Sequence, residues 1–175
     1  MKRDINLWQF FAFTFICVVG SLLHFVYEWT NFTPFAVISS VNESTFEHIK
    51  ILFYPTFIFA IIEWFYFKSY YKGFWCVKLK GIILGVILIP TFFYTLTGIF
   101  GTLKGWVNIL IFFLSAFIAC YYEGKLLKEN KPCKFNLLAF ISLCLIAVLF
   151  SLFTFFPPKI PLFLDPITKT YGIQF

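Results

Sequence analysis

Five apolar stretches, each long enough to cross a lipid bilayer, constrain the fold more than any other feature of this sequence. They cover about residues 7–29, 44–67, 79–100, 105–122 and 135–156. A membrane helix needs about 20 mostly apolar residues. Because backbone that faces lipid must satisfy its own hydrogen bonds, these stretches are expected to be helical. The pattern predicts an all-α fold, a polytopic membrane helix bundle with five transmembrane helices, formed as a single integral membrane domain over residues 1–175.

The composition supports a lipid environment. Hydrophobic residues make up 61% of the 175 residues and charged residues 13%, whereas soluble domains contain about half apolar and about a quarter charged residues. A chain of this length leaves a large share of its surface exposed, so it could not hide that much apolar area from water. The composition therefore excludes a soluble domain and an intrinsically disordered chain.

The basic residues are unequally divided between the two ends of the predicted bundle. Ten of the fourteen lie at the end that carries the N-terminus, whereas the eight acidic residues divide evenly between the ends. The ten are Lys2, Arg3, Lys68, Lys72, Lys78, Lys80, Lys125, Lys128, Lys131 and Lys134, and the acids counted with them are Asp4, Glu63, Glu123 and Glu129. Cytoplasmic loops carry the excess of Lys and Arg, so we expect the N-terminus inside, the C-terminus outside and a bacterial plasma membrane location. Contact with anionic lipid accounts for this charge, which makes membrane lipid the expected partner and not nucleic acid.

The five cysteines, Cys17, Cys76, Cys120, Cys133 and Cys144, show no C-x-x-C spacing. All lie within the predicted spans or near the end assigned to the cytoplasm, where thiols stay reduced. We expect reduced thiols, most of which pack as small apolar residues.

Ionisable residues in the first span point to a functional site. Thr14, Cys17, Ser21, His24 and Glu28 are spaced 3, 4, 3 and 4 residues apart, which places them on one face of a helix. A charged residue within a span costs about 2.5–3.5 kcal/mol on insertion scales and is a functional candidate by default.

A second polar segment, residues 41–50, precedes and enters the second span. The spacing of Ser44 and Glu47 predicts a capping box, in which each side chain bonds the other's backbone N–H. Glu43 and His48 then occupy the two staple positions, which are usually apolar. A carboxylate and an imidazole are therefore expected to meet there.

Two further segments are expected to cover this site. The outer loop, residues 30–43, contains a short apolar run that is predicted to be interfacial or re-entrant. The outer tail, residues 157–175, holds four of the eight prolines, which favour extended backbone. Such a tail should lie along the end of the bundle and carry Asp165 and Tyr171 toward the site.

We therefore expect a polar site at the outer leaflet in which ionisable side chains bind a metal or transfer protons. The expected metal ligands are His24, Glu28, Glu43, Glu47 and His48, of which all but Glu43 are also candidate catalytic residues. The expected substrate or supporting contacts are Asn42, Lys50, Tyr54, Tyr94, Asp165 and Tyr171. Imidazole and carboxylate suit Zn²⁺, Fe or Mn. A metal-free acid/base or ligand site and a structural ion-pair network remain open alternatives.

The chain contains L-H-F-V-Y-E-W over residues 23–29, V-N-E-S-T-F-E-H-I-K over 41–50 and P-P-K-I-P-L-F-L-D-P over 157–166. Through these segments it resembles an uncharacterised family, a domain of unknown function, of small multi-pass membrane proteins from clostridia-like Gram-positive bacteria. The resemblance covers nearly the whole chain. It implies a plasma-membrane protein without an established activity, and it transfers no catalytic residue.

Three functions fit these features. The leading hypothesis is a metal-dependent or acid/base enzyme that acts on a lipid or amphiphile at the outer leaflet. The alternatives are a proton- or cation-coupled small transporter or ligand-binding protein, and an accessory subunit of a membrane complex. Five spans without an inverted repeat are unusual for a transporter, so that alternative would call for a homodimer or a larger membrane complex.

Overall fold

A computed structural model describes residues 4–173. The basic residues Lys2 and Arg3 and the last two residues of the tail therefore lie outside the described residues. The described chain forms five α-helices and two short 3-10 helices. They are α1 (Ile5–Thr30), η1 (Thr33–Val37), α2 (Thr45–Phe67), α3 (Phe74–Phe100), α4 (Gly105–Glu129), α5 (Asn136–Phe155) and η2 (Pro161–Phe163). Between residues 4 and 173 no β-strand is present beyond a single bridge in the tail. The all-helical prediction is confirmed, and all five α-helices are long and apolar enough to cross a membrane.

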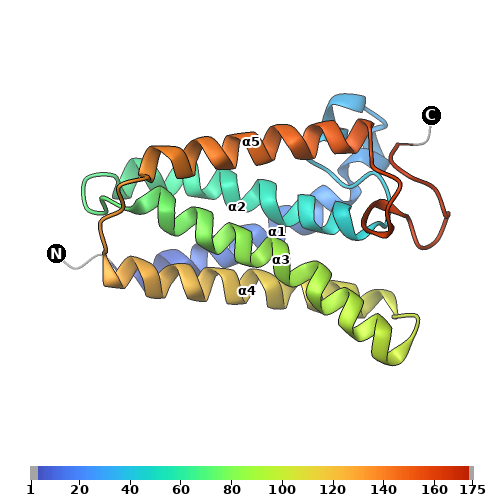
Figure 1. Cartoon of the computed structure of the whole chain (residues 1–175), viewed down its shortest axis with the longest axis horizontal. Coiled ribbons are helices and arrows are strands. Elements are labelled where there is room, and N and C mark those ends of the chain that lie inside the picture. The colour runs from blue at the N-terminus through green and yellow to red at the C-terminus, as the bar shows by residue number, and fades with distance from the viewer. Residues whose placement is uncertain (1–3, 174–175) are drawn as a thin grey trace.

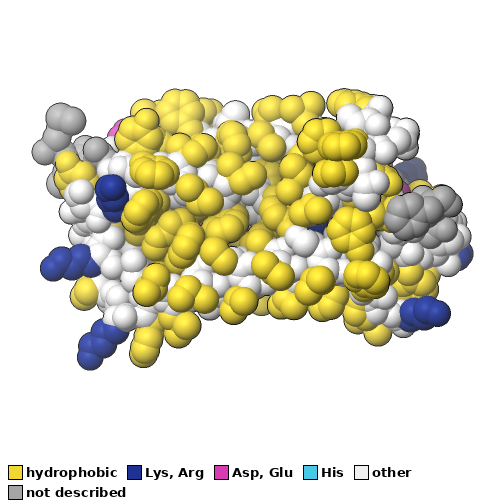
Figure 2. Space-filling model, turned by 90° about the horizontal axis from the view of Figure 1, so that it is seen from above, with side chains coloured by type: hydrophobic (Ala, Val, Ile, Leu, Met, Phe, Trp, Pro, Cys, Tyr) yellow, Lys and Arg dark blue, Asp and Glu magenta, His cyan; other side chains and the backbone are white. Residues whose placement is uncertain are grey.

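Helix α2 lies at the centre of the bundle (Figure 1). It packs against α1 and α3, α4 closes the group by contacting α1 and α3, and α5 packs mainly on α3. Most of α2 is buried, whereas the other four helices each leave one side exposed. Apolar side chains cover these exposed sides, as Figure 2 shows for one face, and they include Leu137 at 70% and Ile99 at 67% exposure. An apolar outer surface of this extent fits lipid and not water.

The described ends of the chain lie at opposite ends of the bundle (Figure 1). The end where α1 begins also carries the exposed lysines of the α2–α3 and α4–α5 connections, and is called the lysine-rich end below. The opposite end carries η1, η2 and the tail. This separation agrees with an odd number of spans, and which end faces the cytoplasm stays a prediction.

Helices α3 and α4 extend further toward the lysine-rich end than the hydropathy pattern predicts. Helix α3 begins at Phe74 instead of residue 79, and α4 continues to Glu129 instead of 122. Lys78 and Glu123 therefore lie inside helices, as Glu63 does, and each of the three is at most 1% exposed. Assigning Lys78 to the loop between the second and third spans was wrong. The opposite charges of the three residues pair with one another, which allows them to be buried where a lone charge could not be.

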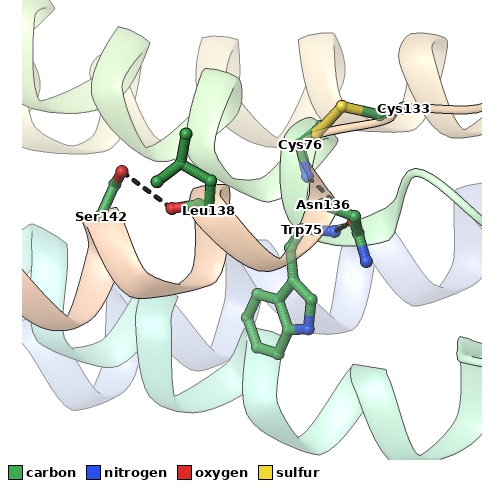
Figure 3. Close-up of a disulfide and its surroundings, with 6 residues drawn as sticks. All are labelled: Trp75, Cys76, Cys133, Asn136, Leu138 and Ser142. Carbon is green, nitrogen blue, oxygen red and sulfur yellow. Dashed lines mark hydrogen bonds between the residues drawn. A yellow bond between two sulfur atoms is a disulfide. The ribbon is translucent and has the colours of Figure 1, made fainter.

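A disulfide joins Cys76, near the start of α3, to Cys133 in the α4–α5 connection (Figure 3). The expectation of reduced thiols is therefore wrong for this pair, and holds for Cys17, Cys120 and Cys144, which are free. Sequence spacing could not reveal the pair because 57 residues separate the two cysteines. Asn136 reinforces the junction, since its side-chain oxygen accepts hydrogen bonds from the backbone N–H groups of Trp75 and Cys76 (Figure 3).

The start of α2 differs from the predicted capping box. Ser44 is the N-cap residue, but its side chain makes no capping hydrogen bond. The carboxylate of Glu47 instead accepts the backbone N–H of Val41 at 3.1 Å. The loop before the helix folds back over the first turn, so it supplies a donor that competes with the helix's own N–H groups.

The loop between α1 and α2 and the tail are both folded against the end of the bundle opposite to the lysines. The loop forms η1, whose Ala36 is fully buried. In the tail, Phe163 of η2 is buried and its ring lies 4.5 Å from that of Phe46 on α2. The prediction that the proline-rich tail lies along the bundle is thus confirmed for the described residues.

Candidate functional site

Three ionisable side chains from two parts of the sequence meet at the end of the bundle opposite to the lysines. His24 comes from α1, Glu43 from the loop before α2 and His48 from the first turn of α2. Nε2 of His24 lies 3.5 Å from Oε1 of Glu43, and Nε2 of His48 lies 3.9 Å from its Oε2. One ligand atom from each residue lies within 4.8 Å of the others. We refer to these three residues as the His–Glu cluster.

The hydrogen bond of His48 fixes which of its ring nitrogens can bind a ligand. Nδ1 lies 2.9 Å from the carbonyl oxygen of Ser44. A carbonyl only accepts, so Nδ1 carries the proton and donates it. In the neutral ring Nε2 then holds the free lone pair, and Nε2 is the nitrogen that faces Glu43. This arrangement, a ring N–H bonded to a backbone carbonyl behind the ligand nitrogen, is the usual support of a metal-binding histidine.

Glu43 is the carboxylate that both imidazoles face. Contact with the His24 ring lowers the pKa of the Glu43 carboxyl below its usual range, against the opposing effect of partial burial. Charge on either imidazole acts in the same direction, whereas the nearby Asp165 opposes it. Glu43 therefore remains an ionised ligand well below neutral pH.

The tail holds the loop that carries Glu43. Asp165 is 3% exposed, and its Oδ2 accepts the backbone N–H of Glu43 at 3.4 Å. Its Oδ1 accepts the backbone N–H groups of Ile167 and Thr168 at 2.7 and 3.2 Å, which fixes the turn that positions it. Asn42 donates from its side chain to the carbonyl of Gly172 at 3.1 Å. Asp165 and Asn42 thus support the cluster by positioning its loop.

A cavity of about 310 Å³ lies beside the cluster, between α1, α2 and α4. Phe25, Ile51, Ile109 and Phe112 form apolar parts of its wall, while the His–Glu cluster and Asn108 supply polar groups. Phe25 and Ile109 are 44% and 57% exposed, so the cavity reaches the surface that would face lipid.

Two residues of the cavity wall, Gly20 and Asn108, have features that bear on ligand binding. A Cβ atom at Gly20 would lie 2.5 Å from the ring of Phe112, so this glycine lets α1 and α4 approach closely. Oδ1 of Asn108 is buried and has no hydrogen-bond partner within the described chain. An acceptor left unpaired beside a cavity is available to a bound molecule.

Glu47 and Lys50 form a separate, fully buried pair behind the cluster. Nζ of Lys50 lies 2.6 Å from Oε2 of Glu47. The same Nζ donates to the carbonyl of Ala36 at 2.9 Å and to the hydroxyl of Thr154 at 3.0 Å. One ammonium group therefore ties α2 to η1 and α5. The side chain of Glu47 is not among the clustered ligand atoms, and its contacts fit a structural clamp.

The remaining predicted residues are not part of the clustered ligand set. Glu28 is exposed on α1 and is not part of the clustered ligand set, although its spacing from His24 suggested one. Tyr54 bonds the carbonyl of Ala147 and the hydroxyl of Ser151, and so joins α2 to α5. Tyr94 is 41% exposed on α3. Tyr171 forms an antiparallel bridge with Leu164 within the tail.

Sequence reasoning missed a second ionisable group at the lysine-rich end. Lys78 of α3 contacts both Glu63 of α2 and Glu123 of α4. Glu63 could have indicated this group, because it is an ionisable residue inside an apolar span, as His24 and Glu28 are. Lys78 and Glu123 gave no such signal because both fell just outside the predicted spans.

Comparisons with known proteins give a family but no activity. Neither the curated proteins nor the solved structures contain a match to this chain. The family model of a family of unknown function, DUF6512, matches residues 1–173 and hence nearly the whole sequence. The chain therefore belongs to this family of unknown function, DUF6512.

Proposed function

We propose that this chain is a multi-pass membrane enzyme that binds a divalent metal at His24, Glu43 and His48 and acts on a lipid or amphiphile. The observation that carries the proposal is the meeting of three ligand atoms, one from α1 and two from the start of α2 and the loop before it, at the wall of an apolar cavity. Two imidazoles and one carboxylate are a common ligand set of catalytic zinc sites, which keep a fourth position open for water or substrate.

The distances in the cluster are close to those of such a site. Two atoms bound tetrahedrally to zinc at about 2.1 Å lie about 3.4 Å apart. The His24–Glu43 distance is 3.5 Å and the His48–Glu43 distance is 3.9 Å. Small side-chain rotations would bring all three atoms to one ion. A zinc ion there would lower the pKa of bound water and supply a nucleophile near neutral pH.

The cavity supports an amphiphilic substrate. Its apolar wall would bury an acyl or other apolar chain, and its polar groups would meet the headgroup. Because its wall includes exposed residues of α1 and α4, a lipid could enter sideways from the membrane. We place the cluster at the outer leaflet of a bacterial plasma membrane on the lysine distribution. The Cys76–Cys133 disulfide at the opposite, lysine-rich end is the one feature of the described residues that argues against a cytoplasmic location of that end.

Metal content of the detergent-purified protein, supplied with Zn²⁺, Fe²⁺ or Mn²⁺ in turn, tests the site. Wild type should hold about one metal ion per chain, as a three-ligand catalytic site does. His24→Ala, Glu43→Gln and His48→Ala should each lose it while remaining folded by circular dichroism. Glu28→Gln is the matched control, since it removes a carboxylate from the same helix outside the cluster. A metal-free wild type, or metal retained in all three cluster variants, would overturn the metal site.

Turnover tests the activity separately. The metal-loaded protein, incubated with bacterial membrane lipids, should form products that mass spectrometry detects and that the His48→Ala variant does not form. Turnover by a metal-free wild type would instead support proton transfer between Glu43 and His24, whose side chains are already in contact. Absence of any product with a loaded site would refute the enzyme.

A further inference from the structure

A second group of ionisable side chains lies at the other end of the bundle. Lys78 contacts a carboxylate oxygen of Glu63 and lies 2.5 Å from Oε2 of Glu123. The three residues come from α3, α2 and α4, and none is more than 1% exposed. We refer to them as the Glu–Lys–Glu cluster.

The charges in this cluster do not balance. One ammonium group faces two carboxylates, so the fully ionised cluster would carry a net charge of −1. Two uncharged groups of the described residues also lie near it: the thiol of Cys120 on α4, and the ring of Phe74, whose centroid is 5.7 Å from Nζ of Lys78. Helix α5 contains no charged residue, and the other described lysines of this end are exposed.

An uncompensated negative charge is costly in a buried site, so the protonated form of this cluster is favoured. Taking an ion out of water costs several kcal/mol unless a partner neutralises it. Two carboxylates that share one site avoid this cost when one of them retains a proton. The second oxygen of each carboxylate, Oε1, is buried without a hydrogen-bond partner in the described residues, so either one offers a place for that proton.

Close packing between α3 and α4 places Glu123 next to Lys78. A Cβ atom at Gly81 would overlap the side chain of Glu123, so only glycine at this position of α3 lets that carboxylate reach Lys78. The cluster is therefore built into the contact between α3 and α4, which is the most extensive helix contact in the bundle.

A cavity lies beside the cluster at the lysine-rich end, and its wall includes Gly124 and Cys120, neighbours of Glu123 on α4. It measures about 380 Å³, lies between α1 and α4, and is lined by Gln9, Cys120, Gly124 and Lys125 among others. Gly124 directly follows Glu123 in α4, and the Gln9 side chain packs against Gly124. Gln9 is 7% exposed, yet neither its amide nitrogen nor its amide oxygen has a partner within the described chain. A cavity with an unpaired amide in its wall can hold water that carries protons.

We propose that the Glu–Lys–Glu cluster is a second functional site, which binds one exchangeable proton and exchanges it with the lysine-rich face through this cavity. On release, the O–H bond of a carboxylic acid breaks, the proton leaves with water as hydronium, and a carboxylate remains beside Lys78. The site would give the protein a proton-binding step independent of the chemistry at the His–Glu cluster.

Infrared spectroscopy of the protein in lipid nanodiscs tests this directly. At neutral pH the wild type should show the C=O band of a protonated carboxylic acid, and the band should shift in D₂O because the proton exchanges. Glu63→Gln and Glu123→Gln should each lose the band, since the remaining carboxylate pairs one to one with Lys78. Glu129→Gln is the matched control, because this residue is exposed near the end of α4, and it should keep the band.

A third variant should strengthen the carboxylic acid band instead of removing it. Lys78→Met leaves two carboxylates without a cation, so both should be protonated and the band should roughly double. The wild-type measurement needs no variant to fold, and a spectrum without the band at neutral pH would overturn the proposal. A band that persists in both Gln variants, or one that does not shift in D₂O, would overturn it as well.

Discussion

Replacing Lys50 by Met tests the structural role of the Glu47–Lys50 pair. Lys50 is 0% exposed, and its ammonium group bonds Glu47, the Ala36 carbonyl and the Thr154 hydroxyl at 2.6–3.0 Å. Methionine fills a similar volume but removes the charge and all three bonds. The Glu47 carboxylate would stay buried, with the Val41 N–H as its remaining donor.

The expected cost is large because the perturbation strands a charge. Removing one partner of a buried ion pair destabilises a protein by about 3–5 kcal/mol. The double variant Glu47→Gln/Lys50→Met removes both charges and keeps an acceptor for Val41. Its loss of stability should be about 0.5–3 kcal/mol smaller than the sum of the losses of the two single variants, the range of coupling energies between residues in contact.

Reversible unfolding in mixed detergent micelles, followed by circular dichroism, measures these free energies. Lys159→Met is the matched control, since this lysine is exposed in the tail at the same end of the bundle, and it should change stability by less than about 0.5 kcal/mol. If Lys50→Met lowered the free energy of unfolding by less than about 1 kcal/mol, the reasoning would be refuted, because removing one partner of a buried ion pair costs more than that. A double variant as unstable as the sum of the single changes would refute the coupling.

Three further predictions follow from the packing and the site. Gly81→Ala should cost about 1–3 kcal/mol of unfolding free energy by overpacking against Glu123; Gly98→Ala has open space around it and should be neutral or stabilising, so equal effects would contradict the packing. Mapping of unreduced peptides should recover Cys76 linked to Cys133, and reduction should lower stability by about 2–4 kcal/mol; labelling of both thiols without reductant would exclude the bond. Metal affinity of the His–Glu cluster should fall as the pH drops below about 6.5, because protons compete with the metal for both imidazoles. Metal titrations at several pH values measure this, and an affinity that does not change with pH would show that the histidines are not ligands.

The meeting of Glu43 and His48 could be anticipated from the sequence because both sit within one turn of a helix start. Their separation and the expected helix geometry were enough to place them face to face, and they lie 3.9 Å apart. The same local reasoning paired His24 with Glu28, which share a helix face. The structure instead turns His24 toward Glu43, a residue that another segment delivers.

Glu47 illustrates why local rules fail at a crowded helix end. The capping-box prediction considered only the helix's own N–H groups as partners for the Glu47 carboxylate. In the folded chain the preceding loop offers the Val41 N–H and α2 offers the Lys50 ammonium, a stronger partner because it is charged. A candidate metal ligand thereby becomes part of an ion pair.

The five helices, their apolar outer surface and the packing of the tail could be predicted from the sequence, because each depends on the length and composition of a continuous segment. Which charges pair depends instead on how the helices pack. Lys78 looks like the other lysines of its end in the sequence, and it is buried because Glu63 and Glu123 reach it from two other helices. The disulfide and the His–Glu cluster arise in the same way, since a contact between distant segments depends on how helices pack, and no local periodicity encodes that.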